Sequence, residues 1–170
     1  GEGAPPVTLA GFIIHGGVVL NSTDTNSRLA LRNCTWPART QPSRRALAAH
    51  DDLAHGDLVV HVGRAHLDRV AFHSLRTSAL ALGPGAEVTV SDSVFAYNRA
   101  DRGAAARVTG GMLTIVRGVI EHNMASVAGG AFAVDNGGAL LLANQTVLRN
   151  NSAPVGGVIF HDASSLAHYG

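Results

Sequence analysis

Short apolar runs separated by glycine and polar residues recur along residues 88–160. Residues 94–98, 119–123 and 147–151 share one pattern: valine, a large apolar residue, two variable residues, and then asparagine. The three asparagines, Asn98, Asn123 and Asn151, are 25 and 28 residues apart. Self-similarity at such a period is typical of a solenoid, in which each repeat buries its apolar face against its neighbours.

The period inside each repeat indicates strands. Residues 88–91, 112–116 and 140–142 are short β-favouring runs between Gly, Asn and Asp. They are too short for helices and lack the apolar spacing of a helix. We therefore predict an all-β fold, a right-handed parallel β-helix of six to seven coils with pectin-lyase-like architecture. A β-sandwich is the alternative, but it does not explain why asparagine recurs at the same phase.

Stacked coils would place equivalent residues of each repeat in columns. Phe95, Ile120 and Leu148 are then expected to be buried in one interior column. We expect Asn98, Asn123 and Asn151 to form an amide ladder beside it, each side chain bonding to the next coil. Because neighbouring side chains on a strand alternate between faces, Asn150 should point outward while Asn151 points inward.

Double glycines accompany these repeats at 110–111, 129–130, 137–138 and 156–157. Together with Phe95-x-x-Asn98, boxes such as Gly137-Gly138-Ala139-Leu140 resemble the repeats of chlamydial polymorphic outer-membrane proteins and of similar algal and protist surface proteins. The resemblance covers residues 88–160 and is faint before them. It implies a β-helix scaffold that serves surface display and adhesion rather than catalysis.

The first half of the chain continues the pattern less regularly. Residues 7–20 read as an early coil, and residues 29–36 superimpose on 88–95, which places Trp36 in the interior column and Asn33 at an outward corner. Residues 37–57 break the repeat and are predicted to form an inserted loop with a short helix over 44–54. We expect residues 1–170 to be a single β-helix segment without caps, a fragment of a larger protein.

Composition indicates the class of protein, its compartment and its source. The chain has 46% hydrophobic and 15% charged residues and a net charge of +1, which argues against disorder and gives no reason to expect nucleic acid as a partner. All 13 cationic residues are arginine, which indicates a GC-rich genome. Four glycosylation sequons, at Asn21, Asn33, Asn144 and Asn150, favour a secreted, extracellular glycoprotein, and the combination points to an algal source. Cys34 has no disulfide partner within the chain.

Candidate catalytic and metal-binding residues are sparse. Asp24, Asp51 and Asp52 are the candidate glycosidase carboxylates, but we expect them in a turn and in the inserted loop rather than on one sheet face. The histidines lack metal-ligand spacing. We therefore expect no cofactor, no metal and no catalytic residue.

The predicted function is a non-enzymatic structural or adhesive segment of a wall, coat or filament. Its partners would be other parts of its own longer chain, neighbouring subunits and N-linked glycans. The alternative is a carbohydrate-binding or polysaccharide-degrading β-helix.

Overall fold

The computed structural model describes residues 7–11, 18–20, 28–37 and 56–162, and every named element in them is a β-strand. The strands form four parallel sheets, which we call A to D. Sheet A contains β1 (Val7–Ala10), β3 (Arg28–Arg32), β6 (Gly63–Asp68), β9 (Ala86–Ser91), β13 (Met112–Val116) and β17 (Ala139–Ala143). Sheet B contains β4 (Thr35–Trp36), β7 (Ala71–His73), β10 (Val94–Ala96), β14 (Val119–Glu121) and β18 (Val147–Arg149).

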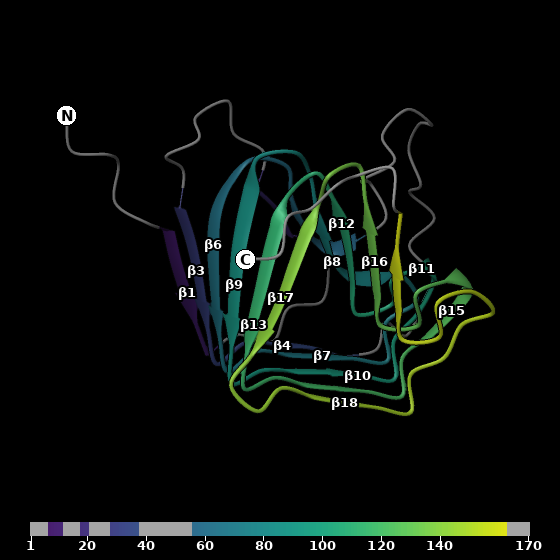
Figure 1. Ribbon diagram of the computed structural model, residues 1–170. Helices are drawn as coiled ribbons and strands as arrows, with labels where there is room; N and C mark the ends of the chain where they lie inside the picture. Colours follow the sequence, from purple (N-terminus) through teal and green to yellow (C-terminus); the bar gives the residue numbers. More distant parts are fainter. Residues whose placement is uncertain (1–6, 12–17, 21–27, 38–55, 163–170) are drawn as a thin grey trace.

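The other two sheets complete each coil. Sheet C contains β2 (Val18–Leu20), β5 (Gly56–Val60), β8 (Ser78–Leu82), β12 (Ala106–Thr109), β16 (Phe132–Asp135) and β19 (Ile159–His161). Sheet D is small and contains only β11 (Arg99–Arg102) and β15 (Met124–Ala128). The chain passes from sheet A to sheet B, then through sheet D in the later coils, and returns through sheet C (Figure 1).

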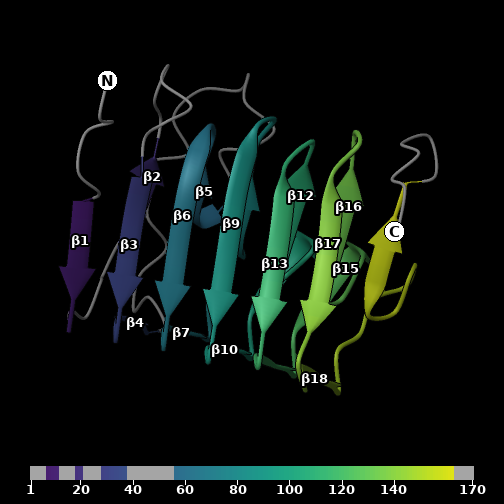
Figure 2. The same cartoon turned by 60° about the vertical axis from the view of Figure 1, so that its left-hand side comes forward.

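These sheets confirm the predicted parallel β-helix. In Figure 1 the chain runs down sheet A, along sheet B and up sheet C while it advances toward the viewer, which makes the coil right-handed. Figure 2 shows the strands of sheet A side by side in sequence order. The six strands of sheet A delimit about five turns, slightly fewer than the six to seven coils that the sequence predicts. The predicted helix at 44–54 lies outside the described residues.

Alternating side chains explain why the sheet A segments form strands. In β9, Ala86, Val88 and Val90 are buried in the coil, whereas Glu87 and Thr89 are exposed. The register also confirms the superposition of the early coil on the later ones, because Leu29 pairs with Ala65 and Ala65 pairs with Val88. A pattern with a period of two therefore fixes which face of each strand enters the core.

The corners of the coil use left-handed backbone conformations at equivalent positions. One column lies between sheets A and B and has φ values from 47° to 53°; it consists of Asn33, Arg69, Asp92, Arg117 and Asn144. A second column follows the sheet B strands and consists of Ser74, Tyr97, His122 and Asn150. At the corner before sheet C the left-handed residue is glycine, and at Gly129 an added Cβ would lie 2.1 Å from the carbonyl oxygen of Phe132. Only glycine fits there without moving the backbone.

The predicted apolar column runs through sheet B. Phe95 pairs with Ile120 and Ile120 pairs with Leu148, while Phe72 and Trp36 extend the register toward the first coils. Phe95 and Ile120 are fully buried, and the rings of Phe72 and Phe95 stack with centroids 5.0 Å apart. Leu148 is only partly buried, which corrects the expectation of full burial. Its strand, β18, is the last of sheet B in the described part of the chain and has a described neighbour, β14, on one side only.

Candidate functional site

The three repeat asparagines form a continuous hydrogen-bonded ladder along the coil axis. The Oδ1 atom of Asn123 accepts from Nδ2 and from the backbone N–H of Asn98, at 3.0 and 3.1 Å. The Oδ1 atom of Asn151 accepts in the same way from Asn123, at 3.0 Å in both bonds. Each Nδ2 also donates to a backbone carbonyl of the preceding coil, for example from Asn123 to Phe95 at 2.9 Å. Every rung therefore connects successive coils.

Burial makes these bonds important for stability. Asn98 and Asn123 have no exposed surface, and a buried amide without partners would carry the full cost of its lost hydration. The ladder continues at Leu75, whose backbone N–H donates to Oδ1 of Asn98 at 3.0 Å. Asn150 is exposed and Asn151 is half-buried, which is the orientation that the alternation predicts.

The sequon asparagines lie at exposed corners where the structure describes them. Asn33 and Asn144 belong to the column between sheets A and B, and Asn150 belongs to the column after sheet B. All three have positive φ, a conformation in which asparagine is enriched. The corner geometry by itself therefore gives a reason for asparagine at these positions. Asn21 lies outside the described residues.

The other candidates from the sequence supply no assembled site in the described part of the chain. Asp24, Asp51 and Asp52 lie outside it. Cys34 is buried, with Sγ 3.3 Å from the carbonyl oxygen of Arg32, so it packs as a core thiol. No group of three or more His, Cys, Asp or Glu residues in the described ranges is placed to hold a metal ion. Those ranges also contain no helix long and apolar enough to cross a membrane.

Exposed charge pairs join the coils at their corners. Arg117 forms two hydrogen bonds with the carboxylate of Asp92, one coil earlier, at 2.6 and 2.7 Å. This contact holds the pKa of Asp92 below its ordinary value and raises the pKa of Arg117. Arg149 and Glu121 form a similar pair one coil later. Tyr97 and His122 add a ring stack with centroids 4.8 Å apart. The corners thus carry polar ladders parallel to the asparagine ladder.

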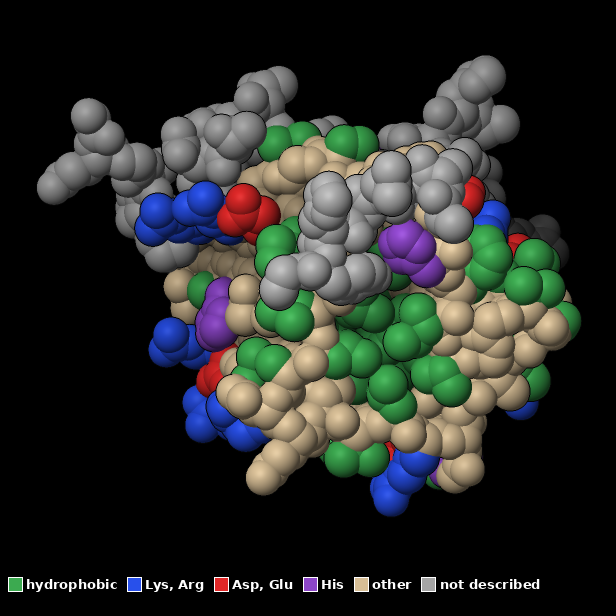
Figure 3. Space-filling model, viewed as in Figure 1, with side chains coloured by type: hydrophobic (Ala, Val, Ile, Leu, Met, Phe, Trp, Pro, Cys, Tyr) green, Lys and Arg blue, Asp and Glu red, His purple; other side chains and the backbone are tan. Residues whose placement is uncertain are grey.

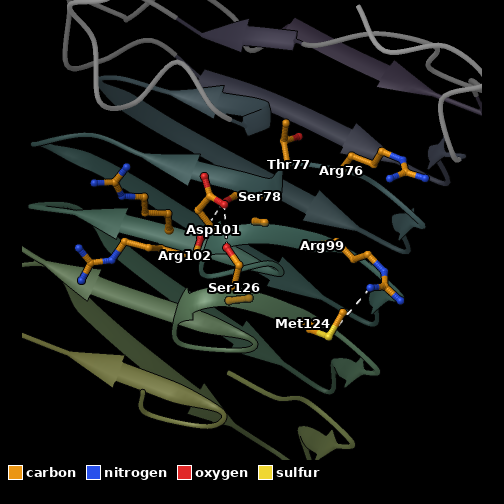
Figure 4. A pocket seen from close by; sticks show the side chains of 11 residues that line it. Arg76, Thr77, Ser78, Arg99, Asp101, Arg102, Met124 and Ser126 are labelled. Carbon is orange, nitrogen blue, oxygen red and sulfur yellow. Dashed lines mark hydrogen bonds between the residues drawn. The ribbon is translucent and has the colours of Figure 1, made fainter. Parts of the chain in front are cut away.

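A groove lies on the side of the coil where sheet D and the segment before β8 meet (Figure 4). It has a volume of about 640 Å³. We call it the arginine groove, because four of its lining residues are arginines. The lining residues come from three successive coils: Arg76, Thr77, Ser78, Arg99, Ala100, Asp101, Arg102, Arg107, Met124, Ala125 and Ser126.

The arginines form two differently held pairs. Arg76 and Arg99 are exposed, and neither forms an ion pair with a described residue. Arg102 and Arg107 are less exposed and both approach the carboxylate of Asp135, at 3.6 and 3.8 Å. The Arg102 guanidinium also lies 4.8 Å from the ring centroid of Phe160. The groove thus carries positive charge in excess of its single lining carboxylate, Asp101.

Figure 4 shows how these side chains are arranged. Arg76 and Arg99 point to one side, Arg102 points to the other, and Asp101 and Ser126 lie between them. The hydroxyl of Ser126 donates to Oδ1 of Asp101 at 2.8 Å, which fixes the carboxylate between the arginines. The groove therefore has two cationic ends and a polar middle.

Sequence reasoning missed this groove. Its arginines are scattered over residues 76–107 and belong to no motif. One signal was present: Arg99 follows Asn98, and Arg76 follows Leu75, which occupies the equivalent position one coil earlier. Extending the asparagine column backward by 23 residues would have placed both arginines in one outward column.

Comparisons with known protein families, curated proteins and solved structures found no match to this chain. The parallel β-helix is therefore shown by the structure alone. The resemblance to surface-protein repeats stays a prediction, and so do the residue roles that it implies.

Proposed function

We propose that this chain is a non-enzymatic structural or adhesive segment of a large secreted, glycosylated cell-surface protein. The observation that carries the proposal is the asparagine ladder, whose bonds run from coil to coil along the axis. The regular features of the chain, namely the ladder, the apolar column and the corner ion pairs, all join neighbouring coils. The repeated residues of this sequence therefore serve to hold the stack of coils together.

The mechanical consequence follows from the direction of these bonds. Separating two coils breaks the backbone bonds of sheets A, B and C together with the rung between their asparagines. The burial of Asn98 and Asn123 keeps water from replacing the rung while the coil is closed. A rod of this kind resists extension along its axis, which suits a wall, coat or filament.

The exposed corners support the secreted and glycosylated part of the proposal. Asn33, Asn144 and Asn150 present their side chains outside the coil, where an N-linked glycan would not enter the core. The partners we propose are other parts of the same longer protein and neighbouring subunits of the assembly. The segment proposed to contact a neighbour is the predicted insertion at 37–57, because its sequence departs from the repeat. Its last two residues, Gly56 and Asp57, are excepted, since they begin β5 of sheet C.

The experiment is surface labelling in the source organism combined with glycan analysis. An antibody against this chain should label intact, unpermeabilised cells. Peptides containing Asn33, Asn144 or Asn150 should lose mass and become aspartate on treatment with an N-glycanase. Labelling that requires permeabilisation, together with unmodified asparagine in all these peptides, would contradict the proposal.

One observation favours a second function, carbohydrate binding. The arginine groove places cationic side chains around hydroxyl and carboxylate groups on an accessible side of the coil. Binding there is compatible with an adhesive segment and requires no catalytic residue.

A further inference from the structure

We propose that the arginine groove binds an acidic polysaccharide, a linear chain of sugars that carries carboxylate or sulfate groups. The inference deepens the proposed adhesive function by naming the class of ligand, and it rests on that function only for its extracellular setting. The ligand would cross sheet D and contact three successive coils. Its binding would therefore depend on the stacking register as well as on single residues.

The exposed pair supplies one anionic subsite. Arg76 and Arg99 lie on neighbouring coils and point to the same side of the groove. Among the described residues, the guanidinium of Arg99 donates only to the sulfur of Met124, at 4.0 Å, so most of its donors are kept for a ligand. Both guanidinium groups lack a carboxylate partner in the described chain, and an anion shared between them would offset the weak repulsion between two exposed like charges. A carboxylate or sulfate is the group that relieves this repulsion.

The second pair supplies a preorganised subsite. Arg102 is held by the ring of Phe160 and by Asp135, and Arg107 approaches the same carboxylate. Two guanidinium groups therefore lie at this end of the groove, and the carboxylate of Asp135 limits their movement. Because these side chains are already fixed, little conformational entropy is lost when an anion binds. Two cationic ends with a gap between them fit a ligand that carries charges at intervals.

The middle of the groove fits sugar hydroxyl groups. Asp101 is an exposed acceptor, oriented by the hydroxyl of Ser126. The hydroxyl of Thr77 donates to the carboxylate of Asp57 at 2.7 Å, so its oxygen can serve a ligand only as an acceptor. A carboxylate accepts hydrogen bonds from hydroxyls but repels phosphates and carboxylates. Its position between the two arginine pairs therefore favours a ligand whose anionic groups are separated by neutral hydroxyl-bearing units.

The lining disfavours two other polyanions. Single-stranded nucleic acids are bound by stacking their bases on aromatic rings, and no aromatic residue is among the described residues that line the groove. An acidic peptide is recognised through pockets for its alternate side chains. The floor here is formed in part by Ala100 and Ala125, which offer no such pockets. A uniform charged sugar chain needs neither feature.

The test uses the 170-residue chain and fluorescently labelled oligomers of polygalacturonate at low ionic strength, with binding followed by fluorescence anisotropy. Arg76→Ser combined with Arg99→Ser should weaken binding about tenfold or more, because each arginine makes a charge-assisted contact. The matched control is Arg28→Ser combined with Arg32→Ser, which removes the same charge from exposed positions on sheet A. This control should change the affinity less than about twofold. Circular dichroism and the urea midpoint establish that both variants are folded.

Three results would overturn the proposal: equal weakening by both double variants, tighter binding of oligothymidylate or polyglutamate than of polygalacturonate, or binding no stronger than that of neutral dextran. Equal weakening would mean that only net charge is sensed. None of these results affects surface labelling or glycan analysis, so failure of the groove and failure of the structural proposal are distinguishable.

Discussion

The middle coils and the last coil of this β-helix have the same motifs but very different burial. In the middle, β9 and β13 bury alternate side chains, and Phe95 and Ile120 have no exposed surface. In the last coil, β17 has no fully buried residue and Leu148 is only partly buried. Asn98 and Asn123 are buried in the middle, whereas Asn151 is half-buried at the end.

This difference shows that the repeat motif determines where a side chain lies in the coil but not how much that side chain contributes to the free energy of unfolding. Leu148 and Asn151 occupy the columns that their motif predicts, yet the burial of each depends on having a coil on both sides. Figure 3 views this end and shows hydrophobic side chains gathered within the ring of the coil. Leu140, Leu142, Leu148 and Val158 are partly buried there and pack against the core. Stability in such a stack is a sum over neighbouring interfaces.

The largest effect should come from the apolar column. Phe95→Ala removes a ring that stacks on Phe72 and lies between coils on both sides, so it should lower the free energy of unfolding by about 3–5 kcal/mol. Leu148→Ala removes a side chain with one neighbouring coil and should cost less than about 2 kcal/mol. Urea denaturation of both variants measures the difference. Equal costs would contradict the comparison, and the exposed Leu141→Ala serves as the control.

Substitutions in the asparagine ladder should likewise cost more stability in the middle coils than in the last coil. The costs should be smaller than those in the apolar column. Asn123→Ala leaves the buried backbone N–H of Asn98 without its acceptor and removes a donor to Phe95, so it should cost about 2–4 kcal/mol. Asn151→Ala should cost about 1 kcal/mol, because water reaches this half-buried rung. Thermal unfolding followed by circular dichroism orders the two variants. If Asn151→Ala lowered the unfolding temperature more than Asn123→Ala, this prediction would be wrong.

The smallest effect should come from the exposed corner pairs. Because Arg117 lowers the pKa of Asp92, the pair contributes stability above the ordinary aspartate pKa of about 4, and this contribution is lost as the pH falls through the lowered value. Asp92→Asn should therefore lower the urea midpoint slightly at neutral pH and leave it unchanged in strong acid. A deficit that persists in strong acid would assign the effect to something other than this pair. Glu121→Gln, whose partner Arg149 lies in the last coil, should also lower the midpoint only slightly at neutral pH, since the side chain of Arg149 is 61% exposed.

The sequence was sufficient to predict the parallel β-helix and its columns. Phe95, Ile120 and Leu148 share a phase with the three asparagines, and only stacked coils satisfy an inward amide at the same phase in each repeat. Trp36 could be placed in the same column because residues 29–36 keep the alternation of sheet A. These features depend on local periodicity, which a single sequence displays.

Four features could not be predicted, for physical reasons. Sheet D contains Arg99–Arg102, whose residues show no β-type alternation; pairing with the next coil makes it a strand. Arg69 and Arg117 adopt the left-handed conformation at corners, which their residue type does not suggest. The arginine groove depends on lateral contacts between coils, so its residues become neighbours only after the register is set. Burial at the end of the stack depends likewise on neighbours rather than on the motif.

Amide hydrogen exchange tests the central claim, a stack whose stability comes from coil-to-coil contacts, most directly. The N–H of Asn98 is bonded to the buried Asn123, and the N–H of Asn123 is bonded to the half-buried Asn151. The two amides have the same residue type and the same kind of acceptor, and they differ only in position along the stack. After correction for intrinsic rates, NMR-detected exchange should be at least about tenfold slower at Asn98 than at Asn123, with the amides of β9 and β13 slower than those of β17. Equal protection at the two asparagines, or faster exchange at Asn98, would contradict this account.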